Sequence, residues 1–151
     1  CDTPFKRSSQ IQMTYTLGEP TRAAAFAKYG VGGWCRQTLS YRLDTSKASP
    51  ELFEWYIAQI DRTPVHVANG MDRAVAAGDL WPRLPEIQTP PLILGGANSQ
   101  IADASHRAAM RERMPRAKVV TFEGYGHGVN LLAPERCVRE VKTFVGGVGR
   151  V

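Results

Sequence analysis

The chain has 151 residues, of which 43% are hydrophobic, 22% charged and 9% aromatic. This balance is typical of a globular protein and excludes a disordered or fibrous one. The longest apolar stretches are only a handful of residues, far below the roughly 20 that a transmembrane helix needs. We therefore expect a soluble chain that does not enter a membrane.

The net charge is +5, because the chain has 19 Lys and Arg residues and only 14 Asp and Glu residues. Such a surplus raises the question of a nucleic-acid partner. The densest basic group is Arg107, Arg111, Arg113, Arg116 and Lys118. Aromatic residues do not interleave with it, as they would on a surface that binds single strands. The pattern indicates a solvated basic helix face, and no nucleic-acid partner is expected.

Three cysteines, Cys1, Cys35 and Cys137, stand at wide spacings without a C-x-x-C pair. This pattern predicts neither a disulfide framework nor a structural zinc site, and it favours a cytoplasmic location. The chain opens on Cys1-Asp2-Thr3, without an initiator Met and without a secretory leader. We expect the sequence to be internal to a longer one.

The first half of the chain reads as mainly helical. An Ala-rich helix is predicted over residues 21–29, ending at Gly30. A second begins after Ser49 with Pro50 at its first position and runs to residue 60. Thr63-Pro64 repeats this start signal, and Gly78 marks the end of the third helix.

Residue 90 marks a change of architecture, because Pro82, Pro85, Pro90 and Pro91 make the preceding segment an irregular connector. After it we expect a buried strand at 92–94 that ends in Gly95-Gly96, a helix at 103–113 and a second strand at 118–122. A glycine-rich loop at 124–128, a helix at 134–145 and a tail at 146–151 complete the chain.

Two parallel strands do not make a sheet, because such strands need neighbours on both sides. We expect the missing strands to lie outside the given sequence. If the chain stands alone instead, exchange of strands into a homodimer is the expected remedy.

The loop Gly124-Tyr125-Gly126-His127-Gly128 places one imidazole just past the carboxyl end of a buried strand. Ligands of open α/β sheets gather at that edge. A histidine there is suited to act as general base and then as general acid. The alternative is a loop histidine bonded to a neighbouring backbone group, and spacing alone does not decide between the two.

A family resemblance bears on this choice. The segments 90–96, 113–120, 124–128 and 133–145 resemble the C-terminal part of the α/β-hydrolase fold. The resemblance implies an α/β protein in which His127 is the histidine of a catalytic triad. Cys1-Asp2-Thr3 resembles the end of the sixth core strand of enol-lactonase-like and esterase-like members. Residues 1–3 would end that strand, residues 4–88 would form a helical lid, and residues 89–151 would complete the parallel core.

The sequence departs from that family at the nucleophile. The family's elbow, G-x-S-x-G on a strand-to-helix turn, is absent, and the nearest string is Gly32-Gly33-Trp34-Cys35-Arg36. That string lacks the final glycine and a preceding buried strand, so Cys35 is expected to be a packing residue. The resemblance places the nucleophile upstream of this segment.

A second departure concerns the triad acid. Most members carry an aspartate shortly after the seventh strand, and the matching position here is Ser99. Serine carries no negative charge to stabilise an imidazolium. Asp2, at the sixth-strand tip, and Asp103 are the two substitutes. For Asp103 the alternative is a helix N-cap, and for Asp2 a hydrogen-bonded loop carboxylate.

The other histidines, His66 and His106, do not pair with a ligand at i, i+4, so no metal site is expected, and no cofactor is implied. The hypothesis is a hydrolase that cleaves a small ester, lactone or similar bond through an acyl-enzyme, with His127 and Asp2 or Asp103 in the triad. The alternative is a non-catalytic protein that binds a small molecule on the same fold. Ser99 in place of the acid favours that alternative.

Overall fold

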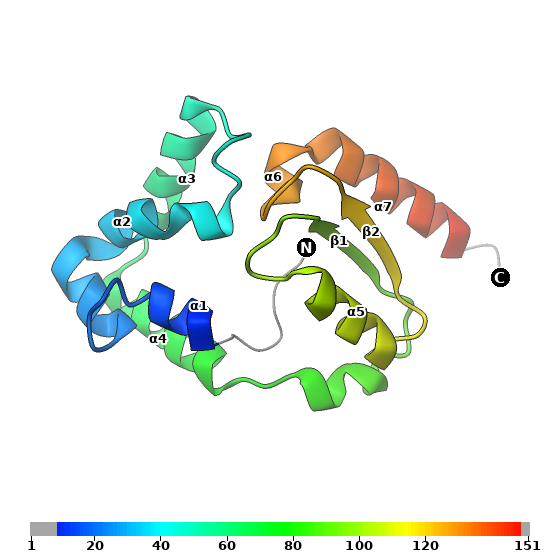
Figure 1. Ribbon diagram of the computed structural model, residues 1–151, viewed down its shortest axis with the longest axis horizontal. Coiled ribbons are helices and arrows are strands. Elements are labelled where there is room, and N and C mark those ends of the chain that lie inside the picture. Colours follow the sequence, from blue (N-terminus) through cyan, green and yellow to red (C-terminus); the bar gives the residue numbers. More distant parts are fainter. Residues whose placement is uncertain (1–8, 149–151) are drawn as a thin grey trace. The chain divides into compact units, whose positions relative to one another are not determined.

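The computed structural model describes residues 9–148, which form two compact units (Figure 1). Among these residues, the first unit extends to Asp79 and the second begins at Leu80. Residues 1–3, the expected end of a core strand, lie outside the described residues.

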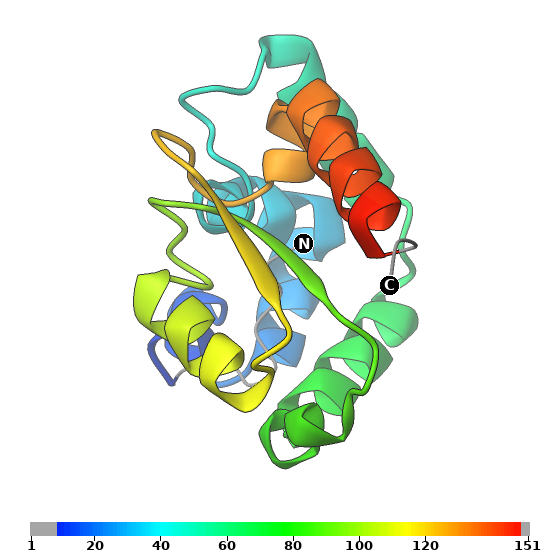
Figure 2. The same cartoon turned by 90° about the vertical axis from the view of Figure 1, so that its right-hand side faces the viewer.

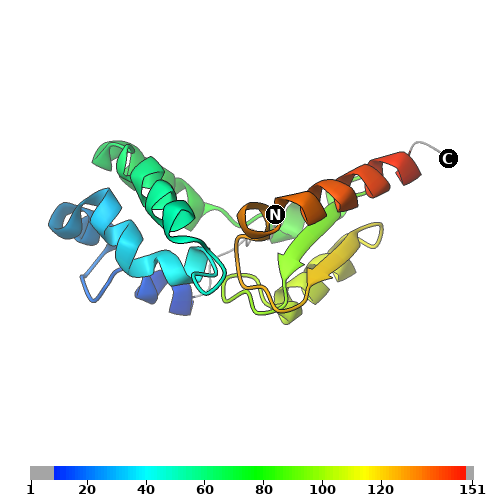
Figure 3. The same ribbon diagram turned by 90° about the horizontal axis from the view of Figure 1, so that it is seen from above.

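In the described part of the first unit, residues 9–79, the regular elements are all helices. They are α1 (Ser9–Thr14), α2 (Arg22–Arg42), α3 (Pro50–Asp61) and α4 (Val65–Ala77). Figure 3 shows α2, coloured blue to cyan, beside the green helices α3 and α4, and both of them contact α2. The predicted N-cap of α3 is confirmed, and α2 has an N-cap as well. The Thr21 side chain accepts a hydrogen bond from the Ala24 N–H at 3.1 Å, and Ser49 accepts one from Leu52 at 3.2 Å.

Helix α2 is longer than predicted. Gly30 does interrupt it, with φ 69° and ψ 166°, but helical geometry resumes at once and continues to Arg42. The sequence predicts a stop because Gly30 suits the left-handed conformation that follows a helix C-terminus. Just beyond it, the Gly32 N–H donates to Asp61 Oδ1 at 2.9 Å, and a Cβ at Gly32 would collide with that side chain.

The second unit contains the two predicted strands, β1 (Leu92–Gly96) and β2 (Lys118–Phe122). They pair in parallel, with Leu92 opposite Lys118 and Gly96 opposite Phe122. Helix α5 (Ala104–Arg113) lies on one face of the pair, and α7 (Pro134–Val148) lies on the other (Figure 2). This strand, helix, strand, helix order confirms the predicted α/β class.

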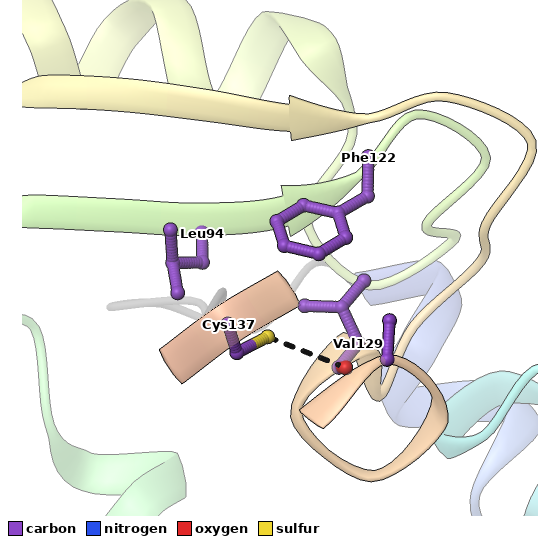
Figure 4. Close-up of a cluster of buried hydrophobic side chains, with 5 residues drawn as sticks. Leu94, Phe122, Val129 and Cys137 are labelled. Atoms are coloured by element: carbon purple, nitrogen blue, oxygen red, sulfur yellow. Dashed lines mark hydrogen bonds between the residues drawn. The ribbon is translucent and has the colours of Figure 1, made fainter. Parts of the chain in front are cut away.

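Buried side chains fix α7 to the strands. The cluster consists of Leu94, Phe122, Val129, Ala133 and Cys137, and Figure 4 shows it. Phe122 is fully buried at the end of β2, and the Cys137 thiol donates to the Val129 carbonyl at 3.4 Å. Val129 begins the short helix α6 (Val129–Leu132), which the sequence analysis did not predict. The cluster therefore anchors the chain immediately after His127.

The proline-rich connector groups with the second unit. It forms a 3₁₀ helix, η1 (Trp81–Glu86), that packs on α5. The centroids of the Trp81 and His106 rings lie 5.0 Å apart. The guanidinium of Arg113 lies 4.8 Å from the centroid of the Trp81 ring. At the other end, α7 continues through Gly146 and Gly147, where a tail was expected.

Within the described part of the chain, the helices lack the combination of length and apolar composition that crossing a membrane requires.

Candidate active site

Two loops meet at the carboxyl ends of β1 and β2, and backbone hydrogen bonds hold them together. The Ala97 N–H donates to the Phe122 carbonyl at 3.0 Å, and the Asn98 N–H donates to the Tyr125 carbonyl at 2.9 Å. Because the strands are parallel, both loops begin at the same edge of the sheet. Residues 97–103 and 123–128 therefore form one site.

Gly96 permits this close approach. A Cβ at Gly96 would overlap the backbone carbonyl groups of Tyr125 and Gly126. Gly128 has φ 91° and turns the chain from His127 into α6. These two glycines place the imidazole of His127 beside the loop that follows β1.

His127 and Ser99 contact each other in this site. Ser99 is 3% exposed, and its Oγ lies 3.2 Å from the Nδ1 atom of the half-buried His127. The backbone fixes Ser99 from both sides. Its own N–H donates to the Gly96 carbonyl at 3.2 Å, and the Ala102 N–H donates to Oγ at 3.2 Å.

The hydroxyl of Ser99 has one proton and two lone pairs. The Ala102 N–H occupies one lone pair. If the second lone pair accepts from Nδ1–H, then Nε2 of His127 is unprotonated and can take a proton from a nucleophile. If the hydroxyl donates to Nδ1 instead, the ring proton sits on Nε2. The arrangement therefore couples the Ser99 hydroxyl to the tautomer of His127.

Asp103 caps helix α5, as one of the two sequence interpretations predicted. Its carboxylate accepts from the His106 N–H at 2.8 Å and from the Ser105 hydroxyl at 2.6 Å. The hydrogen bond from Ser105, followed by that from the His106 backbone, lowers the pKa of the exposed Asp103 carboxyl. Asp2, the other candidate acid, lies outside the described residues.

Cys35 and His66 belong to the helical unit, and Cys137 belongs to the buried cluster that fixes α7. Cys35 is a fully buried, free thiol in the middle of α2, as expected of a packing residue. His66 is exposed on α4. Burial raises the pKa of the Cys137 thiol, which therefore stays protonated in its cluster. Among the residues described, His, Cys, Asp and Glu form no group of three suited to a metal ion.

The sequence makes His127 a candidate through its loop and the family resemblance, but it does not pair His127 with Ser99. Ser99 was considered only as a residue that replaces an acid. The available signal was positional, because Ser99 and His127 each follow the end of a predicted parallel strand. Gly96 was interpreted only as the end of a strand, since a close approach of a distant loop leaves no local signature.

Comparisons with known proteins agree with this fold. Residues 62–146 match the family of TAP-like proteins. The chain is 28% identical over 104 residues to a pimeloyl-[acyl-carrier protein] methyl ester esterase of Nitrosomonas europaea, covering 66% of this chain and 41% of that protein. It is 30% identical over 91 residues to a 2-hydroxy-6-oxo-6-phenylhexa-2,4-dienoate hydrolase of Burkholderia cepacia, covering 58% of this chain and 32% of that one.

Two solved structures share the fold at low identity. A thermophilic esterase from Thermogutta terrifontis superimposes with a TM-score of 0.79 at 22% identity, covering 98% of this chain and 54% of that chain. The enol-lactonase from Burkholderia xenovorans LB400 superimposes with a TM-score of 0.73 at 19% identity, covering 97% of this chain and 53% of that chain. The chain thus spans about half of these structures. Because the family match covers more than half of the 151 residues, the chain belongs to the TAP-like protein family, within the α/β-hydrolase fold superfamily.

Proposed function

We propose that this chain is the helical lid and the C-terminal core of a hydrolase that cleaves an ester, lactone or similar bond through an acyl-enzyme. His127 is the general base and acid of that reaction, and a serine in a preceding part of the protein is the nucleophile. The observation that carries the proposal is the contact between Ser99 Oγ and His127 Nδ1 at the carboxyl ends of two neighbouring parallel strands.

The proposed reaction runs in two stages. Nε2 of His127 takes the hydroxyl proton of the nucleophile as that oxygen attacks the acyl carbon, and the carbonyl electron pair moves onto the oxyanion. When the oxyanion collapses, the bond to the leaving alcohol breaks and the alcohol takes the proton from the imidazolium. Water then repeats both steps on the acyl-enzyme and releases the acid.

A carboxylate stabilises the imidazolium in this scheme, and we assign that role to Asp2 ahead of Asp103. One observation and the family resemblance support the order. Asp103 already accepts two hydrogen bonds as the cap of α5, and it is exposed. The resemblance puts Ser99 where most family members carry the acid, so in this scheme the charge comes from elsewhere. Asp2, at the expected tip of the sixth strand, is the remaining candidate.

The substrate class rests on the relatives. The matched proteins are named as a methyl ester esterase, a dienoate hydrolase, an esterase and an enol-lactonase. An ester or lactone of a small molecule is the class that these names favour. A cytoplasmic location belongs to the same proposal, because the buried Cys35 and Cys137 are free thiols.

A non-catalytic small-molecule-binding protein is the second candidate. One observation favours it, namely that the partner of His127 Nδ1 at the usual acid position is a neutral hydroxyl. Such a protein would bind a small molecule at the site formed by residues 97–103 and 123–128 without having a competent triad.

A serine-directed phosphonate probe and a chromogenic short-chain ester test the proposal on the full-length protein. We expect the wild type to be labelled and to hydrolyse the ester. An unlabelled, inactive wild type would support the binding protein instead. Asp2→Asn should then reduce hydrolysis strongly while Asp103→Asn stays near wild type, and the reverse pattern would assign the acid to Asp103.

A further inference from the structure

The helical unit contains a cavity of about 250 Å³ that the proposed reaction does not use. All of its lining residues lie between Tyr15 and Val75, in the first unit. The apolar part of the lining consists of Phe26, Val31, Trp34, Ile60, Ala68, Met71 and Val75. Met71 is 63% exposed, so the cavity has an apolar side that is open to solvent.

Two arginines line the same cavity. Arg22 is buried, and its guanidinium lies 4.6 Å from the centroid of the Tyr15 ring and 5.4 Å from that of Trp34. Arg42 approaches the same two rings, at 4.4 Å from Trp34 and 5.9 Å from Tyr15. The faces of aromatic rings attract cations, so the rings hold both guanidinium groups at the cavity.

One carboxylate accompanies these two positive charges in the lining, that of Asp72. It forms an ion pair with Arg22 at 2.5 Å. Arg42 donates from Nη2 to the Cys35 carbonyl at 3.1 Å and to the Thr38 hydroxyl at 2.9 Å, both of which are neutral acceptors. The lining therefore carries one positive charge more than it carries negative charges.

Arg42 also has an unsatisfied donor. Its Nε is buried and has no hydrogen-bond partner among the described residues. A buried donor without an acceptor is costly, and more so when the group is charged. An anion in the cavity that pairs with the Arg42 guanidinium would balance the excess positive charge of the lining.

From this arrangement we propose that the cavity binds a small carboxylate with a short apolar chain. The carboxylate pairs with Arg42, and the chain lies against Phe26, Met71 and Val75. The volume is below the roughly 300–1,000 Å³ typical of drug-sized sites, which suits a ligand of the size of octanoate. This site goes beyond the proposed function and does not depend on it.

Calorimetric titration of the full-length protein with octanoate, octanol and octylamine tests the proposal. We expect octanoate to bind and the other two to bind at least about tenfold more weakly, the factor lost with one charge-assisted hydrogen bond. Equal affinity for octanol, or no binding of octanoate, would overturn it. A binding signal needs no catalysis, so failure of the proposed hydrolysis leaves this test intact.

Variants locate the site. Arg42→Gln should lose about tenfold in octanoate affinity, whereas Arg73→Gln, which removes an exposed arginine from the same unit, should stay within about twofold of the wild-type affinity.

If Arg42→Gln fails to fold, the exposed Met71 provides a second pair of variants. Met71→Glu should weaken octanoate binding, and the neutral Met71→Gln should bind octanoate severalfold more tightly than Met71→Glu. Equal binding by the members of both pairs would contradict the assignment.

Discussion

The hydroxyl of Ser99 lies 3.2 Å from Nδ1 of His127, although the two residues are 28 positions apart in the sequence. Each follows the end of one of two parallel strands, and backbone hydrogen bonds join their loops. This geometry makes Ser99 a positioning residue for the imidazole, and it gives the proposed chemistry its first test.

Ser99→Ala removes the hydroxyl while leaving the small side-chain volume nearly unchanged. We expect kcat for ester hydrolysis to fall by about tenfold to a hundredfold, because the imidazole loses the group that selects its tautomer and orientation, with KM within about twofold. Ser99→Thr keeps a hydroxyl and should recover part of the rate. Steady-state kinetics of the three proteins measure this, and an unchanged kcat in Ser99→Ala would exclude a positioning role.

Gly96→Ala should displace the loop that carries His127, because the new methyl group would overlap the carbonyl groups of Tyr125 and Gly126. We expect a loss of stability of about 1–3 kcal/mol, typical of overpacking, together with loss of hydrolysis. Gly146→Ala is the matched control. Its Cβ meets open space in helix α7, so it should stabilise the protein by about 0.5–1 kcal/mol. Urea unfolding of both variants gives the comparison, and equal stabilities would refute the argument.

Asp103→Ala should cost about 1 kcal/mol, because it removes the N-cap of α5, whereas Asp103→Asn should retain most of that stability. The lowered pKa of Asp103 sets the sign of the pH dependence. Its ionised form contributes stability above the ordinary aspartate value of about 3.9, and this contribution is lost as the pH falls through the lower folded-state value. Urea midpoints of wild type and Asp103→Ala should therefore draw closer only at acid pH. A constant difference from pH 7 to pH 3 would argue against this linkage.

Phe122→Ala should destabilise the second unit by about 3–5 kcal/mol, because it leaves a cavity at the centre of the cluster that anchors α7. Val145→Ala changes an exposed position of the same helix and should stay within about 0.5 kcal/mol. Chemical denaturation followed by circular dichroism measures both, and a mild effect at Phe122 would mean that the cluster does not hold the unit together.

The sequence predicted the elements whose signals are local. The cap at Ser49, the cap that was one of two interpretations of Asp103, and the apolar runs of both strands lie within a few residues of the structure they specify. The continuation of α2 past Gly30 was not predictable in this way. Propensity treats Gly30 as a stop signal, and the contact that the next turn makes, from the Gly32 N–H to Asp61 Oδ1, joins residues far apart in the sequence.

The site shows the same division. His127 is a candidate because its glycine-rich loop follows a strand and resembles a family motif, and Asp103 is one because it lies four residues after Ser99. The contact between Ser99 and His127 depends on the parallel pairing and on the missing Cβ of Gly96, which are properties of the fold. The excess positive charge of the helical cavity arises from Arg22, Arg42 and Asp72 on two helices, and no spacing rule groups them.

Hydrolysis of a chromogenic short-chain ester by full-length His127→Ala, with His66→Ala as the control at an exposed histidine, tests the central assignment most directly. A general base and acid at residue 127 predicts a loss of about 10²–10⁴-fold in kcat for the first variant and wild-type kinetics for the second. Full activity in His127→Ala would contradict the assignment of this imidazole to catalysis.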